Sequence, residues 1–335
     1  MRRLAIGGDM RMNGAVLAAR RAGWDADWIR GEDEAGGQER ADVVILPWPR
    51  SFADGKLTCA PPGEAMEKAR ALALVPPCAV ALHGAGIATG ELSQAQAHFD
   101  PSQDEAFLRK NARLTAEGAV AAAMRSAKRA LLGSTCLVTG FGRIGQELTL
   151  RLCAMGAFVI VCARSEEQMR AAHAIGAHPV PLAQLASAAG QADLLFNTVP
   201  ARVLGQDALA AIGKDAILFE LASAPYGEDV EEAVRMGVNL RIESGIPGRY
   251  APMEAGEALF EAAQRYLSGA ERAERAARAA REAQAARALR DAAPPAQSVG
   301  EQGALGEATA PREEGTTGES AAPAAQTELG GEDDG

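Results

Sequence analysis

The 335-residue sequence has no apolar run long enough to span a membrane, and its first apolar segment, Leu4-Ala5-Ile6, is too short for a secretory signal. Its five cysteines form no CxxC pair and no Cys/His cluster with metal-ligand spacing. We therefore expect reduced thiols, no bound metal and a cytoplasmic protein.

Basic charge is also scarce in this sequence. The formal net charge is −10, and the segment 294–335 accounts for −8 of it, with nine acidic residues and one Arg. The remaining chain is close to neutral and offers no broad basic face to a phosphate backbone, so we expect no nucleic-acid partner. The Pro, Gly, Ser, Glu and Ala content of the last segment predicts a disordered acidic tail at 293–335.

What the sequence does contain is an alternation of strand and helix patterns over a length that exceeds one ordinary core. Short apolar runs and helical spacing alternate in the first hundred residues, which predicts an N-terminal flavodoxin-like α/β substrate domain at 1–100. The alternation resumes after Gly133 and predicts a Rossmann NADP-binding domain at 133–254. The fold class expected is α/β, with two doubly wound parallel-sheet domains. The strands expected are 4–6, 42–46, 79–82, 136–139, 158–162, 193–199, 216–221 and 239–242.

Linker helices are expected at 101–132. Ser102 opens a capping-box pattern for a first helix that runs to about Asn111. Thr115 is then expected to cap a second helix that ends near Leu132.

A C-terminal helix is expected at 255–292. It should pack as far as Leu267 and be solvated beyond Gly269, where large apolar residues are lacking.

The strongest chemical motif is Gly140-Phe141-Gly142-Arg143-Ile144-Gly145, a GxGxxG that follows an apolar strand and opens an amphipathic helix. In this context the first glycine allows the tight turn, the second lets a pyrophosphate approach the backbone, and the third lets the helix lie close to the strand. The helix N-terminus then faces the phosphates. A glycine turn in a fold without a cofactor is the alternative.

The cofactor type is read from the end of the next strand, Ala163-Arg164-Ser165. NAD enzymes carry an acidic residue there for the ribose hydroxyls, and this sequence has none. A guanidinium and a hydroxyl suit a 2′-phosphate, so we expect NADP, with Arg143 adding a second charge. Alternatively, Arg164 is solvated and Ser165 only caps the next helix.

Three further loops follow predicted strands, at the edge where ligands bind in open α/β sheets. They are Asn197-Thr198-Val199-Pro200, Ala222-Ser223-Ala224-Pro225-Tyr226-Gly227 and Gly245-Ile246-Pro247-Gly248-Arg249. We assign the first loop to the cofactor. Ser223, Pro247, Gly248 and Arg249 are assigned to the substrate. Since Pro and Gly are common turn formers, each loop alone is also compatible with a structural role.

The first domain offers Gly7-Gly8-Asp9-Met10-Arg11 after its first strand. Arg11 is a candidate clamp for a substrate carboxylate, because guanidinium pairs bidentately with carboxylate; a solvated Arg at a helix start is the alternative. His83 follows a predicted strand and is a candidate acid or base, although a lone His is more often structural. Glu117 is a second candidate base on position alone.

These segments, in their order and spacing, resemble the family of dipicolinate synthase A subunits over nearly all of residues 1–267. The residues that carry the resemblance are Gly7 to Arg11, Asn111, Thr115 to Gly118, Gly140 to Gly145, Ala163 to Ser165, Asn197 to Pro200, Leu221 to Ser223, Gly245 to Gly248, Ala251 and Pro252. It implies NADP-dependent oxidation of dihydrodipicolinate, formed from 4-hydroxy-tetrahydrodipicolinate, to dipicolinate during sporulation. It further implies a partner, the flavoprotein-like B subunit of dipicolinate synthase, and adds Asp9, Asn111 and Thr115 to the substrate-binding candidates.

Two other functions are compatible with the same motifs. One is another two-domain NADP-dependent dehydrogenase of a small acid, of the alanine or shikimate type, although the first domain shows no Lys and Asp motif of the shikimate kind. The other is a non-catalytic NADP(H)-binding component of a complex. The choice of general base and self-association of the chain are left open.

Overall fold

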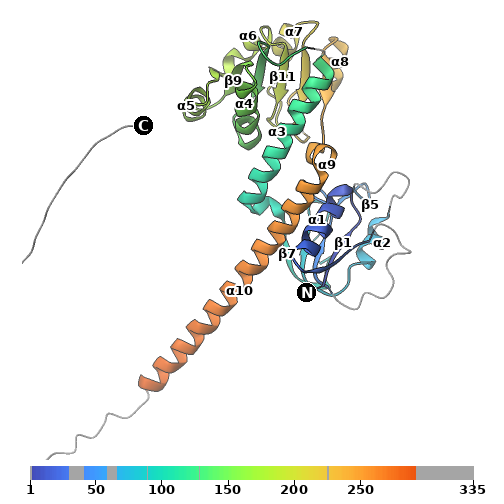
Figure 1. Cartoon of the computed structure of the whole chain (residues 1–335), viewed down its shortest axis with the longest axis vertical. Coiled ribbons are helices and arrows are strands. Elements are labelled where there is room, and N and C mark those ends of the chain that lie inside the picture. Colours follow the sequence, from blue (N-terminus) through green and yellow to red (C-terminus); the bar gives the residue numbers. More distant parts are fainter. Residues whose placement is uncertain are drawn as a thin grey trace, which may run out of the picture. The chain divides into compact units, whose positions relative to one another are not determined.

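The computed structural model describes residues 2–29, 41–58, 66–88, 90–127, 129–224 and 226–291. Two parallel β-sheets, each with helices packed on it, make up most of this part of the chain (Figure 1). No helix within it is long and apolar enough to cross a membrane. The predicted acidic tail at 293–335 lies outside the described residues.

The first sheet has five parallel strands in the order β2-β1-β3-β6-β7. Counted along the chain this is the order 2-1-3-4-5 of flavodoxin-like sheets. Buried clusters cover both of its faces, one with α1 and the other with α2. The elements are β1 (Arg2–Ile6), α1 (Met10–Arg21), β2 (Asp25–Ile29), β3 (Ala41–Ile45), α2 (Lys68–Ala73), β6 (Cys78–Leu82) and β7 (Ala95–Phe99), with a small hairpin of β4 (Phe52–Ala53) and β5 (Lys56–Leu57).

The second sheet has six parallel strands in the order β10-β9-β8-β11-β12-β13, which is the 3-2-1-4-5-6 order of a Rossmann sheet. Its strands are β8 (Thr135–Thr139), β9 (Phe158–Ala163), β10 (His178–Pro181), β11 (Leu194–Asn197), β12 (Ile217–Glu220) and β13 (Asn239–Ile242). Its helices are α4 (Arg143–Ala154), α5 (Glu166–Ala174), a 3₁₀ turn (Leu182–Gln184), α6 (Leu185–Ala189), α7 (Gln206–Ala211) and α8 (Val230–Arg235). Apolar clusters again lie on both faces. The predicted fold class, α/β with two doubly wound parallel sheets, is confirmed.

The segment between the sheets differs from the prediction of two helices. After a 3₁₀ turn (Pro101–Gln103), one continuous helix, α3 (Glu105–Ala127), runs through Thr115. The Thr115 hydroxyl donates to the carbonyl oxygen of Asn111 within the helix (2.8 Å), so it does not act as an N-cap. The caps lie earlier and are aspartates. Asp100 accepts from the backbone N–H of Ser102 (2.8 Å) at the 3₁₀ turn, and Asp104 accepts from the backbone N–H of Phe107 (3.0 Å) at the start of α3.

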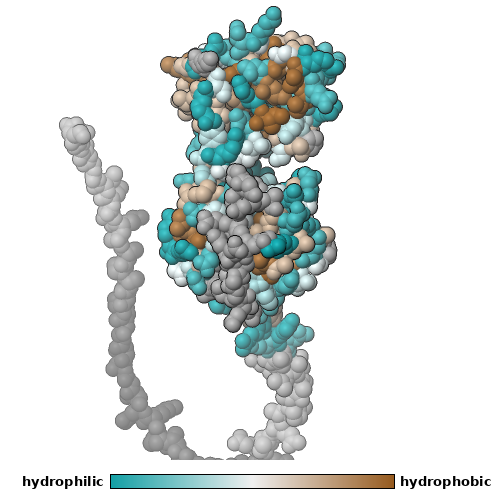
Figure 2. All heavy atoms as spheres, turned by 90° about the vertical axis from the view of Figure 1, so that its right-hand side faces the viewer, coloured by the Kyte–Doolittle hydropathy of each residue, from teal (hydrophilic) through white to brown (hydrophobic). Residues whose placement is uncertain are grey.

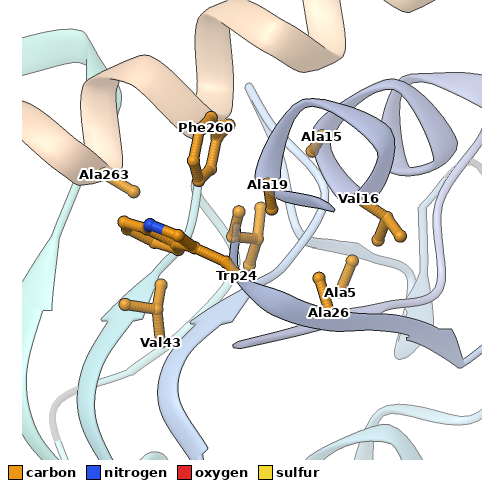
Figure 3. Close-up of a pocket in the computed structure, with 10 residues that line it drawn as sticks. Ala5, Ala15, Val16, Ala19, Trp24, Ala26, Val43, Phe260 and Ala263 are labelled. Carbon is orange, nitrogen blue, oxygen red and sulfur yellow. The ribbon is translucent and has the colours of Figure 1, made fainter. Parts of the chain in front are cut away.

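The last helices are α9 (Ile246–Tyr250) and α10 (Pro252–Asp291). The first turns of α10 pack on the first domain, where Phe260 lies edge-on to Trp24 with ring centroids 4.7 Å apart (Figure 3). Small residues, among them Ala19 and Ala263, surround the two rings. Leu267 is the last apolar residue of α10 in this core, and the side chains of 270–284 are exposed, as predicted.

The face that Figure 2 presents is mostly hydrophilic, with hydrophobic areas on both sheet domains. In the second domain, Val234 and Ile242 are exposed apolar side chains on α8 and β13.

Candidate dinucleotide-binding site

The glycine loop lies between β8 and α4, and each of its three glycines meets a different steric demand. Gly140 has a φ of +89°, and a Cβ there would lie 2.6 Å from a methyl group of Val199. A Cβ on Gly145 would overlap the carbonyl oxygen of Gly140, so this glycine lets the helix approach the strand. Gly142 has no atom within 4 Å of its Cβ position, so the backbone faces open space there. The loop therefore has the turn, the close packing and the opening that a pyrophosphate requires.

The N-terminus of α4 is suited to bind an anion. Gly142 is its N-cap and supplies no side-chain oxygen, and the first turn contains no acidic residue. The first N–H groups of a helix have no partner within the helix, and the helix dipole favours negative charge at this end. A bound phosphate group would satisfy both conditions.

A cavity of about 370 Å³ lies over this loop. That volume is within the range of small-molecule sites. Its lining comes from the carboxyl ends of β8, β9, β10 and β11 and from the segments that follow them: Gly140, Phe141, Gly142, Cys162, Ala163, Arg164, Gln168, Leu182, Thr198, Val199, Pro200, Ala201 and Val203. The glycine loop, the end of β9 and the segment after Asn197, all of which the sequence singles out, thus line one cavity.

At the end of β9, Arg164 is exposed and lines this cavity. Ser165 is the N-cap of α5, and its hydroxyl oxygen accepts from the backbone N–H of Gln168 (3.2 Å). Ser165 therefore acts as a helix cap through its side-chain oxygen, as the alternative interpretation has it. Its hydroxyl proton is still able to donate to a ligand. No carboxylate belongs to this strand end, whose residues are Ala163, Arg164 and Ser165.

Arg143, expected to add a second positive charge, is the first residue of α4. Its Nη2 and Nε atoms donate to one carboxylate oxygen of Glu105 at 2.6 and 3.0 Å. Both side chains are half exposed. The carboxylate offsets the charge of Arg143, and because an exposed ion pair contributes little free energy, the guanidinium can exchange this partner for a phosphate at small cost.

The segment after β11 divides into a buried part and a part that lines the cavity. Asn197 is fully buried, and its side chain bonds to both backbone polar groups of Val199. The Thr198 hydroxyl donates to the carbonyl oxygen of Thr139 (2.9 Å). Val199 and Pro200 are left to line the cavity. Asn197 thus shapes this wall without facing the cavity.

In the first domain, Asp9 and Arg11 form an ion pair beside the substrate loop predicted at 245–249. Arg11 Nε donates to Asp9 Oδ1 (2.8 Å), and Nη1 donates to the carbonyl oxygen of Trp48 (2.7 Å). A Cβ on Gly248 would lie 2.8 Å from Asp9 Oδ2 and 2.9 Å from Arg11 Nε. The structure therefore brings Asp9, Arg11 and Gly248 together, with the Arg11 guanidinium buried and partnered.

Beside this contact, α1 and α10 cross with backbone against backbone. A Cβ on Gly14 would lie 2.5 Å from the carbonyl oxygen of Met253. On the facing helix, a Cβ on Gly256 would overlap the carbonyl oxygen of Arg11. These two glycines fix the start of α10 against α1.

The substrate loop itself forms α9, in which Pro247 is buried. Arg249 is half exposed and pairs with Glu243, while its guanidinium also lies over the ring of Tyr250 (5.5 Å). A Cβ on Gly118 would overlap Ile246, so α9 lies directly on α3 near Thr115. Arg249, which was predicted to bind the substrate, is therefore already paired with a carboxylate.

The two candidate bases are in different surroundings. His83 is partly buried after β6, with Nδ1 2.9 Å from the carbonyl oxygen of Gly84. Because a carbonyl only accepts, this contact favours the neutral tautomer with its proton on Nδ1, in which Nε2 carries the lone pair. Glu117 is exposed and pairs with Arg151 of α4 (3.1 Å). Arg151 lies about 12 Å along that helix from Arg143. Neither is among the residues that line the 370 Å³ cavity.

The remaining substrate candidates are Asn111, Thr115 and Ser223. Asn111 is partly buried and Thr115 is buried, one turn apart on α3. Ser223 is exposed in the segment after β12. Pro225 of that segment lies outside the described residues.

Sequence reasoning missed a buried pair of acids at this edge. Glu220 is fully buried at the end of β12, and Glu228 is 3% exposed. Burial first, and the neighbouring Glu220 next, raise the pKa of Glu228 to about 8. One signal was present in the sequence, since Glu220 interrupts the apolar strand Ile217–Leu221, and a charge inside such a run requires partners.

Known proteins share the fold and parts of the sequence. Residues 106–230 match the NAD-binding domain of the D-isomer specific 2-hydroxyacid dehydrogenases. Over 154 residues, 46% of this chain, the sequence is 30% identical to the A subunit of dipicolinate synthase from Bacillus subtilis (strain 168). The resemblance to this family is confirmed. The matched segment spans about half, 52%, of that relative's length.

Two solved structures of the dipicolinate synthase A subunit share the fold. The Bacillus subtilis structure has a TM-score of 0.67 at 24% identity and covers 80% of this chain and 96% of its own. The Bacillus halodurans structure has a TM-score of 0.65 at 23% identity and covers 79% and 97%. The second domain is thus a dehydrogenase-type domain, and its cofactor class is a nicotinamide dinucleotide.

Proposed function

We propose that this chain acts as the A subunit of dipicolinate synthase in the cytoplasm of sporulating cells, oxidising dihydrodipicolinate, formed from 4-hydroxy-tetrahydrodipicolinate, to dipicolinate with NADP+. The observation that carries the proposal is the cavity that joins the glycine loop to Arg164 at a strand end without a carboxylate. The substrate comes from the resemblance to the dipicolinate synthase relatives.

The residues of the cavity fit NADP+, which would accept the hydride when bound. The N–H groups at the start of α4 and the open side of Gly142 would hold the pyrophosphate. Arg164 would pair with the 2′-phosphate, and the Ser165 hydroxyl would donate to it. Val199 and Pro200 would line the cofactor on another side.

On the substrate side, the chain must neutralise two carboxylates and take up a proton. Arg249 can exchange Glu243 for a substrate carboxylate, because it is half exposed. Arg11 is buried and already paired with Asp9, so we assign it to positioning Asp9 beside Gly248 and not to binding a substrate carboxylate. His83 is the better placed base, because its Nε2 lone pair is available and Glu117 is tied to Arg151.

The reaction itself requires only a small chemical contribution from the protein. Loss of a hydride and a proton from a dihydropyridine yields an aromatic ring, so the step runs downhill. The protein supplies orientation of the ring carbon and neutralisation of the carboxylates. From the resemblance, the flavoprotein-like B subunit is the expected partner.

The test is hydride transfer by the purified chain, followed as NADPH absorbance with freshly prepared dihydrodipicolinate, with and without the B subunit. We expect turnover with NADP+ and, for Arg164→Asp, a loss of preference for NADP+ over NAD+ of about ten- to a hundredfold, since one hydrogen-bonded charge pair is removed. Arg170→Asp, on the exposed face of α5, is the matched control and should change little. An unchanged preference in Arg164→Asp would refute the NADP assignment.

The match to the D-isomer specific 2-hydroxyacid dehydrogenase domain supports a second candidate, a dehydrogenase of another small acid. The same assay with 2-hydroxy acids in place of dihydrodipicolinate separates the two. NADP(H) binding without turnover on either substrate, with the B subunit present, would instead indicate a non-catalytic binding component.

A further inference from the structure

The Glu220 carboxylate binds the backbone near both ends of the segment that separates Glu220 from Glu228. Oε1 of Glu220 accepts the backbone N–H of Ala222 (2.7 Å), and Oε2 accepts the backbone N–H of Gly227 (2.9 Å). A Cβ on Gly227 would overlap the amide of Asn197, so the segment lies directly on the buried strand ends. The exposed Ser223, a proposed substrate contact, belongs to this segment.

The same carboxylate also holds the wall of the cofactor cavity. Asn197 and Glu220 are partners on the adjacent parallel strands β11 and β12, and Asn197 Nδ2 donates to Glu220 Oε2 (2.7 Å). The other hydrogen bonds of the Asn197 side chain go to Val199, which lines the cavity. Glu220 thus joins the cofactor wall to the segment that follows β12.

Glu228 has different surroundings. Both of its carboxyl oxygens are buried, and neither makes a hydrogen bond of ordinary geometry to a described residue. An ionised carboxylate in that position would be very costly, so the group is held neutral, and a neutral carboxyl has an O–H to donate. Glu220 is the titratable group that acts on it. The adjacent Asp229 is directed elsewhere, to the backbone N–H of Glu232 and to Arg202.

We propose that Glu220 and Glu228 are positioning residues. Glu220, as a carboxylate, holds the backbone of Ala222 and Gly227 beside the cofactor cavity, and Glu228, buried directly after Gly227, is a neutral carboxylic acid that leaves this arrangement undisturbed. Loss of the Glu228 proton to solvent would place two anions in one buried region, and their repulsion would release these two backbone contacts. The role in hydride transfer rests on the proposed function, whereas the protonation of Glu228 does not.

The protonation of Glu228 is tested on the ligand-free protein by amide hydrogen exchange at Ala222 and Gly227 and by infrared spectroscopy across about pH 5 to 9. We expect the protection factor of the Ala222 and Gly227 amides to fall as the pH passes about 8. Glu228→Gln keeps a neutral donor, so its protection should not change across this range. The carboxylic-acid carbonyl band present in the wild type near neutral pH should be missing from Glu228→Gln. Glu231→Gln, an exposed neighbour on α8, should behave as the wild type does.

Glu220→Gln should lower protection of the two amides by about ten- to a hundredfold, because the acceptor loses its charge and one of the two acceptor oxygens is replaced by an NH2 group, which faces an N–H. If this variant does not fold, Glu228→Gln decides alone. The proposal is overturned if Glu228→Gln and the wild type share the same infrared band and the same pH dependence of exchange.

The positioning role is tested separately with the pH profile of hydride transfer. Glu228→Gln should move the alkaline limb of kcat to higher pH. An unmoved limb overturns the positioning role in hydride transfer even if Glu228 is found to be protonated. If the wild type transfers no hydride while the exchange result holds, the proposed function is wrong and the protonated Glu228 stands.

Discussion

Replacing Phe260 by Ala should destabilise the first domain by about 4 kcal/mol. The ring is 4% exposed and makes an edge-on contact with Trp24, so the variant loses its transfer free energy and an aromatic pair. Phe to Ala substitutions in cores cost about 3 to 5 kcal/mol. The neighbours include Ala15, Ala19 and Ala263, whose methyl groups cannot turn into the empty volume, and a void of about 10 Å³ is already present. These features place the cost in the upper part of the range.

The measurement is urea unfolding followed by tryptophan fluorescence, because Trp24, Trp28 and Trp48 all lie in the first domain. The control is Phe158→Ala, whose ring is 55% exposed at the start of β9 in the second domain and which should shift this transition little. A loss below about 1 kcal/mol for Phe260→Ala would refute the reasoning, because it would mean that α10 does not complete this core.

Two further predictions follow from charged groups. The raised pKa of Glu228 means that the folded chain keeps a proton that the unfolded chain releases; its contribution to stability is complete below about pH 4.5 and is lost by about pH 8, at about 1.4 kcal/mol per pH unit. Glu228→Gln should remove this slope from urea titrations read by circular dichroism, and parallel profiles would contradict the assignment. Glu105→Gln should tighten NADPH binding in fluorescence titrations by up to about fivefold, because Arg143 loses its carboxylate partner. Glu166→Gln serves as its control, and weaker or unchanged binding would show that Arg143 does not reach the phosphates.

The central elements of both sheets were predictable because their residues are locally consistent. The apolar runs at the centres of the sheets are buried on both faces, so they stand out from the amphipathic helices between them. The glycine loop was also predictable, since its spacing follows from the turn, the opening and the helix contact that the backbone alone requires.

The edge strands β2, β7 and β10 were not predicted from the hydrophobic pattern, whereas the edge strand β13 was. β7 reads AQAHF and β10 reads HPVP, and each pairs on one side only, so neither needs an apolar sequence. The division of α3 into two helices was wrong for a different reason. Thr115 is a good cap in isolation, but its hydroxyl bonds within the helix, and the residues on both sides of it are helix formers.

The segments that form the candidate site were predictable from the sequence. The ion-pair partners of its charged side chains were not. Arg143 and Glu105 are 38 residues apart, so nothing local indicates that they pair. Asp9 and Arg11 lie close in sequence, yet their contact with Gly248 depends on tertiary packing. The sequence analysis assigned Arg11 and Arg249 to the substrate from the chemistry of the guanidinium group alone. The structure adds that each of them is already paired with a carboxylate.

The crossing of α1 and α10 at Gly14 and Gly256 limits which amino-acid substitutions this protein can accept. Since backbone meets backbone there, neither helix can gain a side chain without moving the other, and no rotamer can relieve the overlap. The two glycines therefore behave as one position, and an alanine at either should have the same effect. That effect would reach Arg11 and the loop at Gly248, so the geometry around the proposed substrate is set partly by a contact that no substrate touches.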